Sequence, residues 1–334
     1  MRVTMREVAA RAGVSVATVS NVITGKKYVG AEAEAIVRKV MDELDYQPNI
    51  IARSLKINCT YSIGVIVPDT TNPFFGDMIK YVQNAMEQRH YQILLMNSDN
   101  NVERELKALR SFSSFGVDGI INIAPRIKEE ILNTSFDMPM VILDRPPFET
   151  TNNIGFVYAD NYTASRGISK YLMEKDYNKF LCLSGPIELV PNAYLRWKGF
   201  ADGLLSSGVK EEDIHKEECE FSFESGYSMA GKLIDKGIIQ PRMAIFATSD
   251  IMAWGVLERL KEADFRVPQD VGIVGYDDIF YTRFLTPSLT TVKTPRKSLG
   301  VKGAELLLQA IENKEQLKGK SIKLESVILE RKSS

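Results

Sequence analysis

The sequence has few cysteines and few histidines, and this scarcity excludes several classes of protein. Its 334 residues include three cysteines, Cys59, Cys182 and Cys219, which lie far apart and form no CxxC motif. This spacing argues against a zinc site and against a disulfide framework. The two histidines, His90 and His215, belong to no Ser-His-Asp pattern, and the sequence has no phosphate-binding loop. We therefore expect no catalytic residue, no metal, no cofactor and no enzymatic activity.

Two further absences concern membranes. No apolar run is long enough to span a bilayer, and no leader combines positive charges with a following apolar segment. We therefore expect a cytoplasmic protein without a membrane partner. The composition, 44% hydrophobic and 25% charged, is ordinary for a globular protein, and the length leaves room for about two or three domains.

The net charge of −1 is divided unevenly along the chain. Residues 1–60 hold nine Lys and Arg against six Asp and Glu, a net of +3, whereas residues 61–334 hold 33 against 37, a net of −4. A basic end on an otherwise acidic chain is typical of a nucleic-acid-binding segment. Because +3 is modest, one copy would bind DNA phosphates weakly, and a dimer would double the contacts.

The basic end begins with a pattern of two short helices joined by a tight turn. Thr4 and Glu7 have the spacing of a capping box at the start of the first helix. Gly13 is suited to end that helix, and Ser15 is suited to cap the next. Apolar residues predict close packing of the two helices: Val8, Ala9, Ala12, Val19, Val22 and Ile23. A third helix is predicted after Gly30, whose lack of a capping side chain predicts fraying, with apolar positions Ile36, Val37, Val40, Met41 and Leu44.

The second helix leaves a slim face opposite its apolar one, formed by Val16, Ala17, Ser20 and Asn21. Such a surface near a helix N-terminus is suited to enter a DNA major groove. A hairpin that serves only packing or dimerisation would show the same spacing. At this point both interpretations stay open.

The segment YQPNIIARSLKIN, residues 46–58, favours the DNA interpretation. Pro48 opens a stretch too short to be a stable lone helix, yet Arg53 and Lys56 flank Leu55. Cations of this kind bind phosphates, and a leucine can wedge a minor-groove base step. The alternative for Leu55 is an ordinary linker side chain. We favour the wedge because no core is expected nearby for the leucine to fill.

With TMREVAARAGVSVATVSNVI and YQPNIIARSL at this spacing, the chain resembles the lactose-repressor (LacI) family of bacterial transcription regulators. The resemblance implies a homodimer on a near-palindromic operator, with the segment from Pro48 to Leu55 folding into a helix only on DNA. Leu55 would then open the central base step, while Ala52 packs against its symmetry mate. The implied DNA-binding residues are Thr4, Ser15, Val16, Ala17, Thr18, Ser20, Asn21, Asn49, Ala52, Arg53 and Leu55.

From Tyr61 onward, apolar runs alternate with helical stretches. The runs predict buried parallel strands at residues 62–68, 92–97, 119–124, 140–144, 180–185, 244–249 and 271–276. This alternation is typical of doubly wound parallel α/β sheets, in which ligands bind at the carboxyl ends of the strands. Carboxylates, amides, arginines and aromatic rings gather after these strands, a mixture that suits a sugar.

Residues 61–331 resemble the type I periplasmic sugar-binding-protein fold that forms the regulatory core of LacI-family proteins, in which two subdomains close on a ligand. The resemblance implies a ligand set of Asn72, Phe74, Phe75, Asp144, Arg145, Arg196, Phe221, Asp250 and Asp277. Ser249 and Thr294, also expected beside the ligand, stand where the family usually has an Asn and a Gln. These two departures bear on the identity of the ligand, not on the fold.

Three members of this set have other interpretations. We expect Phe75 to stack on the ligand, whereas the alternative for Phe74 is a core position. The alternative for Asp144 and Arg145 is a surface ion pair, which would contribute little to folding stability. The alternative for Asp277 is a residue that only caps a turn.

The predicted organisation is a small all-α helix-turn-helix domain at residues 1–47, a linker at 48–60 and an α/β core at 61–334. The core would contain two doubly wound parallel-sheet subdomains, one of residues 61–159 and 292–320 and the other of residues 160–291 and 321–331. Crossings between them are expected near residues 158–161, 288–293 and 317–323. The resemblance places dimer contacts along residues 74–88 and 250–262, and the lack of a leucine-heptad tail predicts a dimer rather than a tetramer.

We therefore expect a sugar-responsive repressor whose allosteric core releases the operator when a neutral monosaccharide binds, with a pentose such as ribose ahead of a hexose. Asp144, Arg145, Arg196 and Asp277 favour a neutral ligand because two carboxylates balance two guanidiniums, whereas a phosphorylated sugar would require surplus positive charge. Two alternatives stay open. One is a corepressor such as a nucleobase, which would strengthen DNA binding, and the other is activation by a phosphorylated protein partner.

Overall fold

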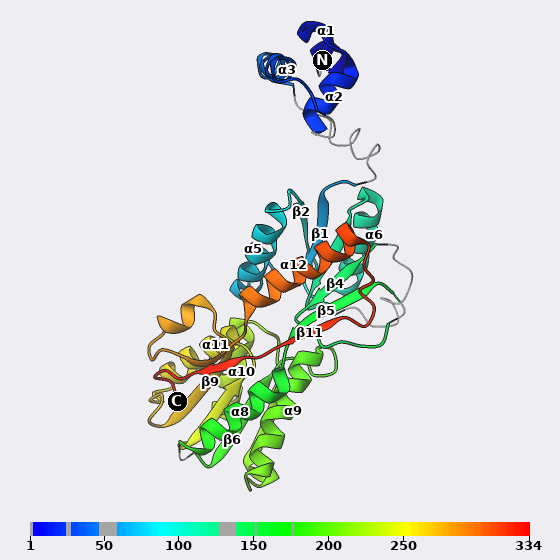
Figure 1. The fold of residues 1–334 in the computed structure, drawn as a ribbon. Coiled ribbons are helices and arrows are strands. Elements are labelled where there is room, and N and C mark those ends of the chain that lie inside the picture. Colours follow the sequence, from blue (N-terminus) through cyan, green and yellow to red (C-terminus); the bar gives the residue numbers. More distant parts are fainter. Residues whose placement is uncertain (1–2, 25–27, 47–58, 127–137, 151, 176) are drawn as a thin grey trace. The chain divides into compact units, whose positions relative to one another are not determined.

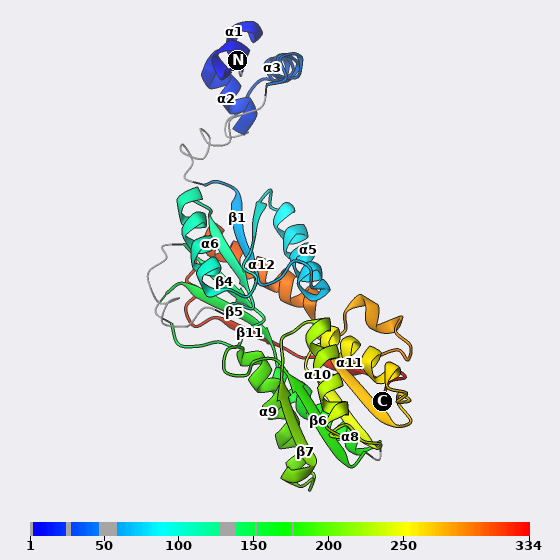
Figure 2. The same ribbon diagram turned by 180° about the vertical axis from the view of Figure 1, so that it is seen from behind.

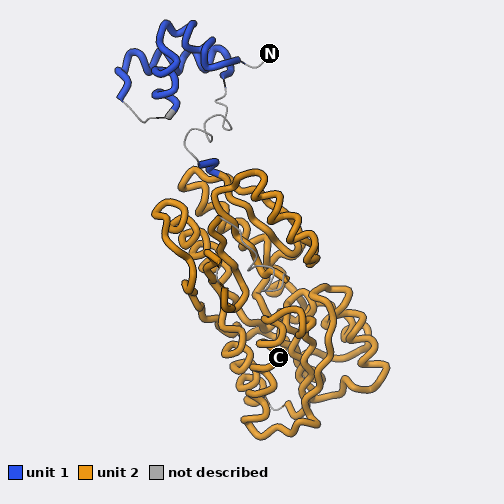
Figure 3. Tube along the Cα trace, turned by 90° about the vertical axis from the view of Figure 1, so that its right-hand side faces the viewer, with its two compact units in different colours: residues 1–61 blue, residues 62–334 orange. Residues whose placement is uncertain are grey.

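The structure is a computed structural model of the chain and describes residues 3–24, 28–46, 59–126, 138–150, 152–175 and 177–334. The chain forms two compact units, residues 1–61 and residues 62–334 (Figure 1, Figure 3). The described part of the first unit is helical, and the second unit contains two six-stranded sheets. Among the described residues, no helix has the length and apolarity that a bilayer span requires.

The first unit consists of α1 (Met5–Ala12), α2 (Val16–Thr24) and α3 (Ala31–Glu43). The predicted capping box of Thr4 and Glu7 is present, and Gly13 ends α1 with a φ of 66°. Gly30 provides no side-chain cap, yet α3 begins directly after it. Ile36, predicted in the core, is 43% exposed, because the next residue, the fully buried Val37, takes the inward position. The buried core residues are Val8, Ala9, Val19, Val22, Val37, Val40 and Tyr46.

The first subdomain of the second unit contains a parallel sheet in the order β11-β5-β4-β3-β1-β2. Its strands are β1 (Ser62–Val67), β2 (Gln92–Asn97), β3 (Gly119–Ile123), β4 (Met140–Leu143), β5 (Ile154–Ala159) and β11 (Ser321–Leu324). α6 (Val102–Phe115) covers one face, and α5 (Pro73–Glu87) and α12 (Arg296–Asn313) cover the other (Figure 1, Figure 2). The approach of α6 requires glycine at position 64, because a Cβ atom there would clash with the ring of Phe112.

The second subdomain contains a sheet in the order β12-β10-β9-β8-β6-β7, parallel except for the β10–β12 pair. Its strands are β6 (Lys179–Ser184), β7 (Ile214–Glu218), β8 (Met243–Ala247), β9 (Val271–Asp277), β10 (Thr290–Lys293) and β12 (Val327–Leu329). Leu181 and Leu183 face α10 (Phe223–Asp235) and α11 (Asp250–Glu262). Phe180 faces α8 (Asn161–Met173) and α9 (Pro191–Ser206) on the other side. Helices therefore cover both faces of each sheet, which confirms the predicted fold class.

The seven predicted strands are all present, but one of them has a different environment from the predicted one. The run at residues 92–97 predicts a buried strand, whereas β2 is an edge strand with Leu94 38% exposed and Leu95 43% exposed. β7, the edge strand of the other sheet, has the polar sequence IHKEE, which the apolar pattern does not predict. An apolar run indicates a strand but not its place in the sheet, which depends on pairing between distant segments.

The chain crosses between the subdomains three times. The first crossing lies between β5 and α8, inside the predicted region at residues 158–161. The second lies between β10 and α12, and residues 292–293 belong to the second subdomain, not the first as expected, because β10 pairs with β9 and β12. Residues 321–324 likewise belong to the first subdomain because β11 pairs with β5, so the third crossing lies at residues 325–326. Strand partners decide these boundaries, and the sequence pattern does not reveal partners.

Candidate functional site

A cavity of about 80 Å³ lies between the two subdomains, at the carboxyl ends of their parallel strands. Nine of the eleven residues in the predicted ligand set line it: Asn72, Phe74, Phe75, Asp144, Arg145, Arg196, Phe221, Ser249 and Asp277. They come from strand ends and helix N-termini of both subdomains. The arrangement of the two subdomains thus brings together residues that are far apart in sequence.

The N-terminus of α5 supplies the aromatic part of the cavity. Asn72 caps this helix, because its Oδ1 accepts a hydrogen bond from the backbone N–H of Phe74 at 3.0 Å, and Pro73 occupies the first helical position. The rings of Phe74 and Phe75 meet edge to face with centroids 5.1 Å apart, and both line the cavity. Phe74 is only 3% exposed, so it also serves as a core residue.

Asp144 and Arg145 follow β4 on the same side of the cavity. Asp144 has a φ of 55°, a left-handed conformation that residues with side chains seldom adopt, and its N–H donates to the carbonyl of Val157 at 2.9 Å. The Arg145 guanidinium lies 5.0 Å from the ring centroid of Phe148, and its Nη1 donates to the Pro125 carbonyl at 3.4 Å. Asp144 is 5% exposed and Arg145 7%, so they do not form a surface ion pair.

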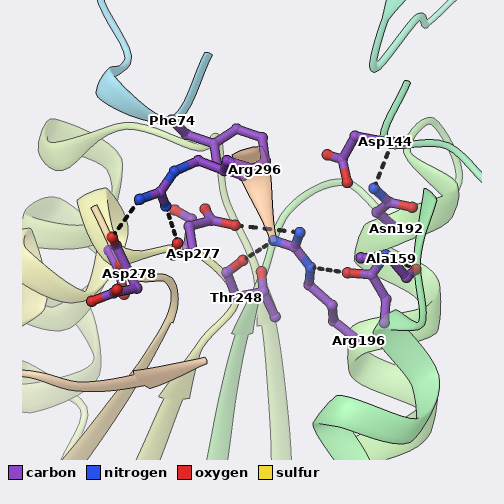
Figure 4. Close-up of polar contacts among 12 residues, drawn as sticks. Phe74, Asp144, Ala159, Asn192, Arg196, Thr248, Asp277, Asp278 and Arg296 are labelled. Carbon is purple, nitrogen blue, oxygen red and sulfur yellow. Dashed lines mark hydrogen bonds and ion pairs between the residues drawn. The ribbon is translucent and has the colours of Figure 1, made fainter. Parts of the chain in front are cut away.

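Arg196, on α9, organises the second subdomain's side of the cavity (Figure 4). Its Nε donates to Oδ1 of Asn161 at 2.7 Å, and its Nη1 donates to the Thr248 carbonyl at 2.6 Å. Its Nη2 lies 3.5 Å from Oδ1 of Asp277, and the guanidinium carbon lies 3.8 Å from the ring centroid of Tyr276. One buried side chain therefore joins the ends of β8 and β9 to the first crossing.

Burial changes the acidity of two carboxyls in the cavity. Desolvation raises the pKa of Asp144 to about 7, with a smaller increase from Asp277 and an opposing effect of Arg196. Desolvation also raises the pKa of Asp277 to about 6, against the attraction of Arg196 and Arg296. Both carboxyls therefore titrate close to neutral pH, where each can change from hydrogen-bond donor to acceptor.

Asp250 and Thr294, the other two predicted ligand residues, do not line the cavity. Both carboxylate oxygens of Asp250 have internal partners, because Oδ1 accepts from the Thr291 hydroxyl at 2.5 Å and Oδ2 accepts from the N–H of Ile279 at 2.8 Å. Asp250 thus ties the start of α11 to β10 and to the turn after β9. Thr294 is buried between β10 and α12. The motif shows that these residues follow strands, but not which way their side chains point.

Four polar residues that line the cavity are missing from the predicted set: Asp69, Asn100, Arg126 and Asn192. Nδ2 of Asn192 donates to the carbonyl of Asp144 at 2.8 Å, a contact between the two subdomains (Figure 4). Its Oδ1 is buried and accepts no hydrogen bond from the described residues, so it can bind a ligand hydroxyl. All four residues come after a strand of their own sheet, so the rule that ligands bind at the carboxyl ends of parallel strands could have found them.

The charged groups of the lining balance. It holds three carboxylates and three guanidiniums, whose formal charges cancel: Asp69, Asp144, Asp277, Arg126, Arg145 and Arg196. Among the described residues, no group of three His, Cys, Asp or Glu side chains is placed to hold a metal ion. The arrangement offers hydrogen-bond donors, acceptors and aromatic rings to an uncharged polar molecule.

In the first unit, the predicted DNA-reading face of α2 lies at the surface. Its members, Val16, Ala17, Ser20 and Asn21, are exposed or half-buried, and so is Thr18, another predicted DNA-binding residue. The Ser15 hydroxyl caps α2 by accepting from the N–H of Thr18 at 3.0 Å, and Thr4 caps α1. These hydroxyls therefore fix the helix starts. The predicted linker residues lie outside the described residues: Asn49, Ala52, Arg53 and Leu55.

Comparisons with known proteins cover both units. The family model of bacterial regulatory proteins of the lacI family matches residues 4–49, and that of periplasmic binding proteins and the sugar binding domain of the LacI family matches residues 60–331. The ribose operon repressor of Escherichia coli K12 is 30% identical over 334 residues, 99% of each chain. The repressor PurR of Edwardsiella ictaluri is 32% identical, over 99% of this chain and 96% of its own. A crystal structure of a LacI family regulator from Enterococcus faecium with bound ribose is 26% identical, with a TM-score of 0.72, and the match covers 82% of this chain and 98% of that chain.

Proposed function

Because the chain belongs to the LacI family of bacterial regulatory proteins, we propose that it represses sugar-utilisation genes and leaves its operator when a neutral monosaccharide, with ribose favoured, binds the cavity. The protein is a transcriptional regulator and not an enzyme. The balanced set of three carboxylates and three guanidiniums beside two phenylalanine rings carries the effector proposal. Sugar hydroxyls need both donors and acceptors, and the apolar face of a sugar packs on aromatic rings.

Two relatives favour ribose among the neutral sugars. One is the Escherichia coli ribose operon repressor, which is similar over nearly the whole chain. The other is the Enterococcus faecium regulator, whose structure holds ribose. A sugar phosphate fits less well while the lining carboxyls are ionised, because the three carboxylates then balance the three guanidiniums and leave no surplus cation for the phosphate.

Calorimetric titration of the full-length protein tests the effector. We expect one ribose per chain and weaker binding of hexoses, sugar phosphates and nucleobases. Ribose should also lower the affinity for operator DNA, by about 5–150-fold if the coupling has the usual size for allosteric proteins. Tight binding of a nucleobase or a sugar phosphate without binding of any neutral sugar would overturn the proposal.

The proposed allosteric mechanism uses the contacts that the cavity makes with both subdomains. Asn72, Asp144 and Arg145 approach it from the first subdomain, whereas Arg196 and Asp277 approach it from the second. A ligand that bonds to both sides favours one relative arrangement of the subdomains over another. Because a repressor of this family acts on bacterial DNA, we also propose that the protein is cytoplasmic.

We also propose a homodimer, in which two exposed apolar surfaces of the core meet a second copy of the chain. One surface is β2 beside α5, with Leu94 and Leu95. The other is the turn after β9, where Tyr281 is 46% and Phe284 65% exposed, and where the ring centroid of Tyr281 lies 5.9 Å from that of Trp254 on α11. Light scattering should find a dimer, and Phe284→Arg should shift it toward monomer. A monomeric unmodified protein would rule this proposal out.

The predicted linker wedge has its own test. Leu55→Ala should strongly weaken operator binding, because a wedge stabilises only kinked DNA, while ribose affinity should stay the same. Fluorescence anisotropy with a labelled operator and calorimetry with ribose measure the two effects. Unchanged operator affinity would show that Leu55 is an ordinary linker residue.

A further inference from the structure

Arg296 connects the part of the cavity lining at Asp277 to α5. It is the first residue of α12, and its side chain is 13% exposed. Its Nη1 donates to the carbonyl of Asp277, and its Nη2 donates to the carbonyl of Asp278 at 2.8 Å (Figure 4). Its Nε forms an ion pair with Asp77 of α5 at 3.2 Å. One guanidinium therefore contacts both subdomains.

The backbone that Arg296 contacts has an unusual conformation. Asp277 has a φ of 115° and Asp278 a φ of 54°, values that residues with side chains seldom adopt and that neighbouring contacts must maintain. A second contact comes from Arg331, whose Nη2 lies 2.5 Å from Oδ1 of Asp278. Arg296 holds the main chain at the point where the Asp277 carboxyl enters the cavity.

We infer that Arg296 is a positioning residue for effector binding, which holds Asp277 toward the cavity and links it to α5. This inference rests on the proposed function, because it takes Asp277 to be an effector ligand. Arg296 does not line the cavity itself, so it acts through the aspartate. Its ion pair with Asp77 extends the connection to a helix of the first subdomain.

The charges around Asp277 determine what the loss of Arg296 should do. Two cations, Arg196 on α9 and Arg296 on α12, act electrostatically on Asp277. Asp277 in turn acts on three titratable groups, Asp144 after β4, Asp250 on α11 and its neighbour Tyr276. Asp278, the next residue in sequence, acts on Asp250. Burial raises the pKa of Asp277 to about 6, against the lowering effects of Arg196, Arg296 and the Thr294 side chain. Removal of Arg296 should therefore raise this pKa further. Because the pKa is above its ordinary value in the folded protein, stability falls as pH rises, and a higher pKa deepens that fall and extends it to higher pH.

The first experiment needs no effector. Thermal unfolding of the full-length protein between about pH 5 and pH 8 compares the wild type with Arg296→Gln, Arg296→Lys and Lys297→Gln. Arg296→Gln should steepen the fall of the melting temperature with pH, whereas Arg296→Lys, which keeps the charge, should stay close to the wild type. Lys297→Gln removes the same charge from an exposed neighbour and should leave the profile unchanged.

Two results of this experiment would overturn the inference. One is a pH profile of Arg296→Gln that matches the wild type. The other is a change in the profile that persists in an Asp277→Asn background, since the effect must pass through that carboxyl. If Arg296→Gln does not fold, Arg296→Lys and Asp77→Asn carry the second experiment.

The second experiment is calorimetry with ribose. Arg296→Gln should weaken binding by about tenfold or more, the loss expected when charge-assisted hydrogen bonds are removed. Asp77→Asn should weaken it less, because Arg296 keeps its two carbonyl partners, and Lys297→Gln should bind like the wild type. If the wild type binds ribose and Arg296→Gln binds it equally well, the inference is wrong. If the wild type does not bind ribose, the effector proposal fails, and the pH profiles alone decide the role of Arg296.

Discussion

The two functional surfaces of this chain differ in how their side chains are held. In the core cavity, Arg196 is 4% exposed and Asp277 5%, and residues from several other elements contact them. On α2, Val16 is 43% exposed, and the Ser15 hydroxyl caps the helix through a partner three residues away. Changes in the cavity should therefore alter folding stability and ligand binding together. Changes on the face of α2 should alter DNA recognition alone.

The largest expected effect is that of Arg196→Ala. Removing this guanidinium leaves Asp277 without a buried ion partner and removes the hydrogen bonds to Asn161 and Thr248, which should cost about 3–5 kcal/mol of core stability and abolish the ribose response. Differential scanning calorimetry measures the stability, and titration measures the binding. Arg166→Ala, an exposed arginine on α8, is the control and should stay within about 0.5 kcal/mol of the wild type. A stable Arg196→Ala protein that lacks only ribose binding would contradict the expectation that changes in the cavity alter stability and ligand binding together.

A smaller effect should appear in the pH dependence of stability. The folded protein holds the pKa of Asp144 at about 7, above its ordinary value of 3.8, so the folded state binds more protons than the unfolded state between about pH 4 and pH 7. The melting temperature should therefore fall as pH rises through this window. Asp144→Asn should flatten the fall, and Asp235→Asn, at an exposed position on α10, should leave it unchanged. Equal slopes in all three proteins would contradict the burial argument.

The loss of a helix cap in the first unit should have a local effect. Ser15→Ala removes the acceptor of the Thr18 N–H and should destabilise α2 by about 1 kcal/mol, with faster amide exchange in that helix. Ser15→Asn, which can also cap a helix, should restore most of the protection. The melting temperature of the core and its ribose affinity should not change. A shift in either would show that the two surfaces are not independent.

The smallest effect on stability is expected for Val16→Thr. This exposed position should tolerate the change within about 0.5 kcal/mol, yet the preferred operator half-site should change, because the side chain is expected to contact base edges rather than phosphates. Selection from a randomised operator library, repeated at two salt concentrations, separates base preference from phosphate contacts. An unaltered half-site would mean that another surface reads the DNA.

The sequence alone was sufficient where the determining contacts lie within a few residues. The capping box of Thr4 and Glu7, the helix end at Gly13 and the cap at Ser15 were predicted correctly because each depends on neighbours at most five positions away. The strands were predicted from apolar runs that need no knowledge of the rest of the chain. The runs and the polar residues after them predicted a pocket at the strand ends, and the family resemblance named its residues, of which nine of eleven line the cavity.

The tertiary structure decided what depends on partners far apart in sequence. β2 lies at an exposed edge, and residues 321–324 join the first sheet, because strand pairing is chosen between distant segments. Asp250 turns inward to Thr291 and Ile279, whereas Asn192 reaches across to Asp144, although both residues follow strands in the sequence. The motif places a residue near the cavity, but the packing of neighbouring elements decides whether its side chain bonds to the protein or faces the ligand.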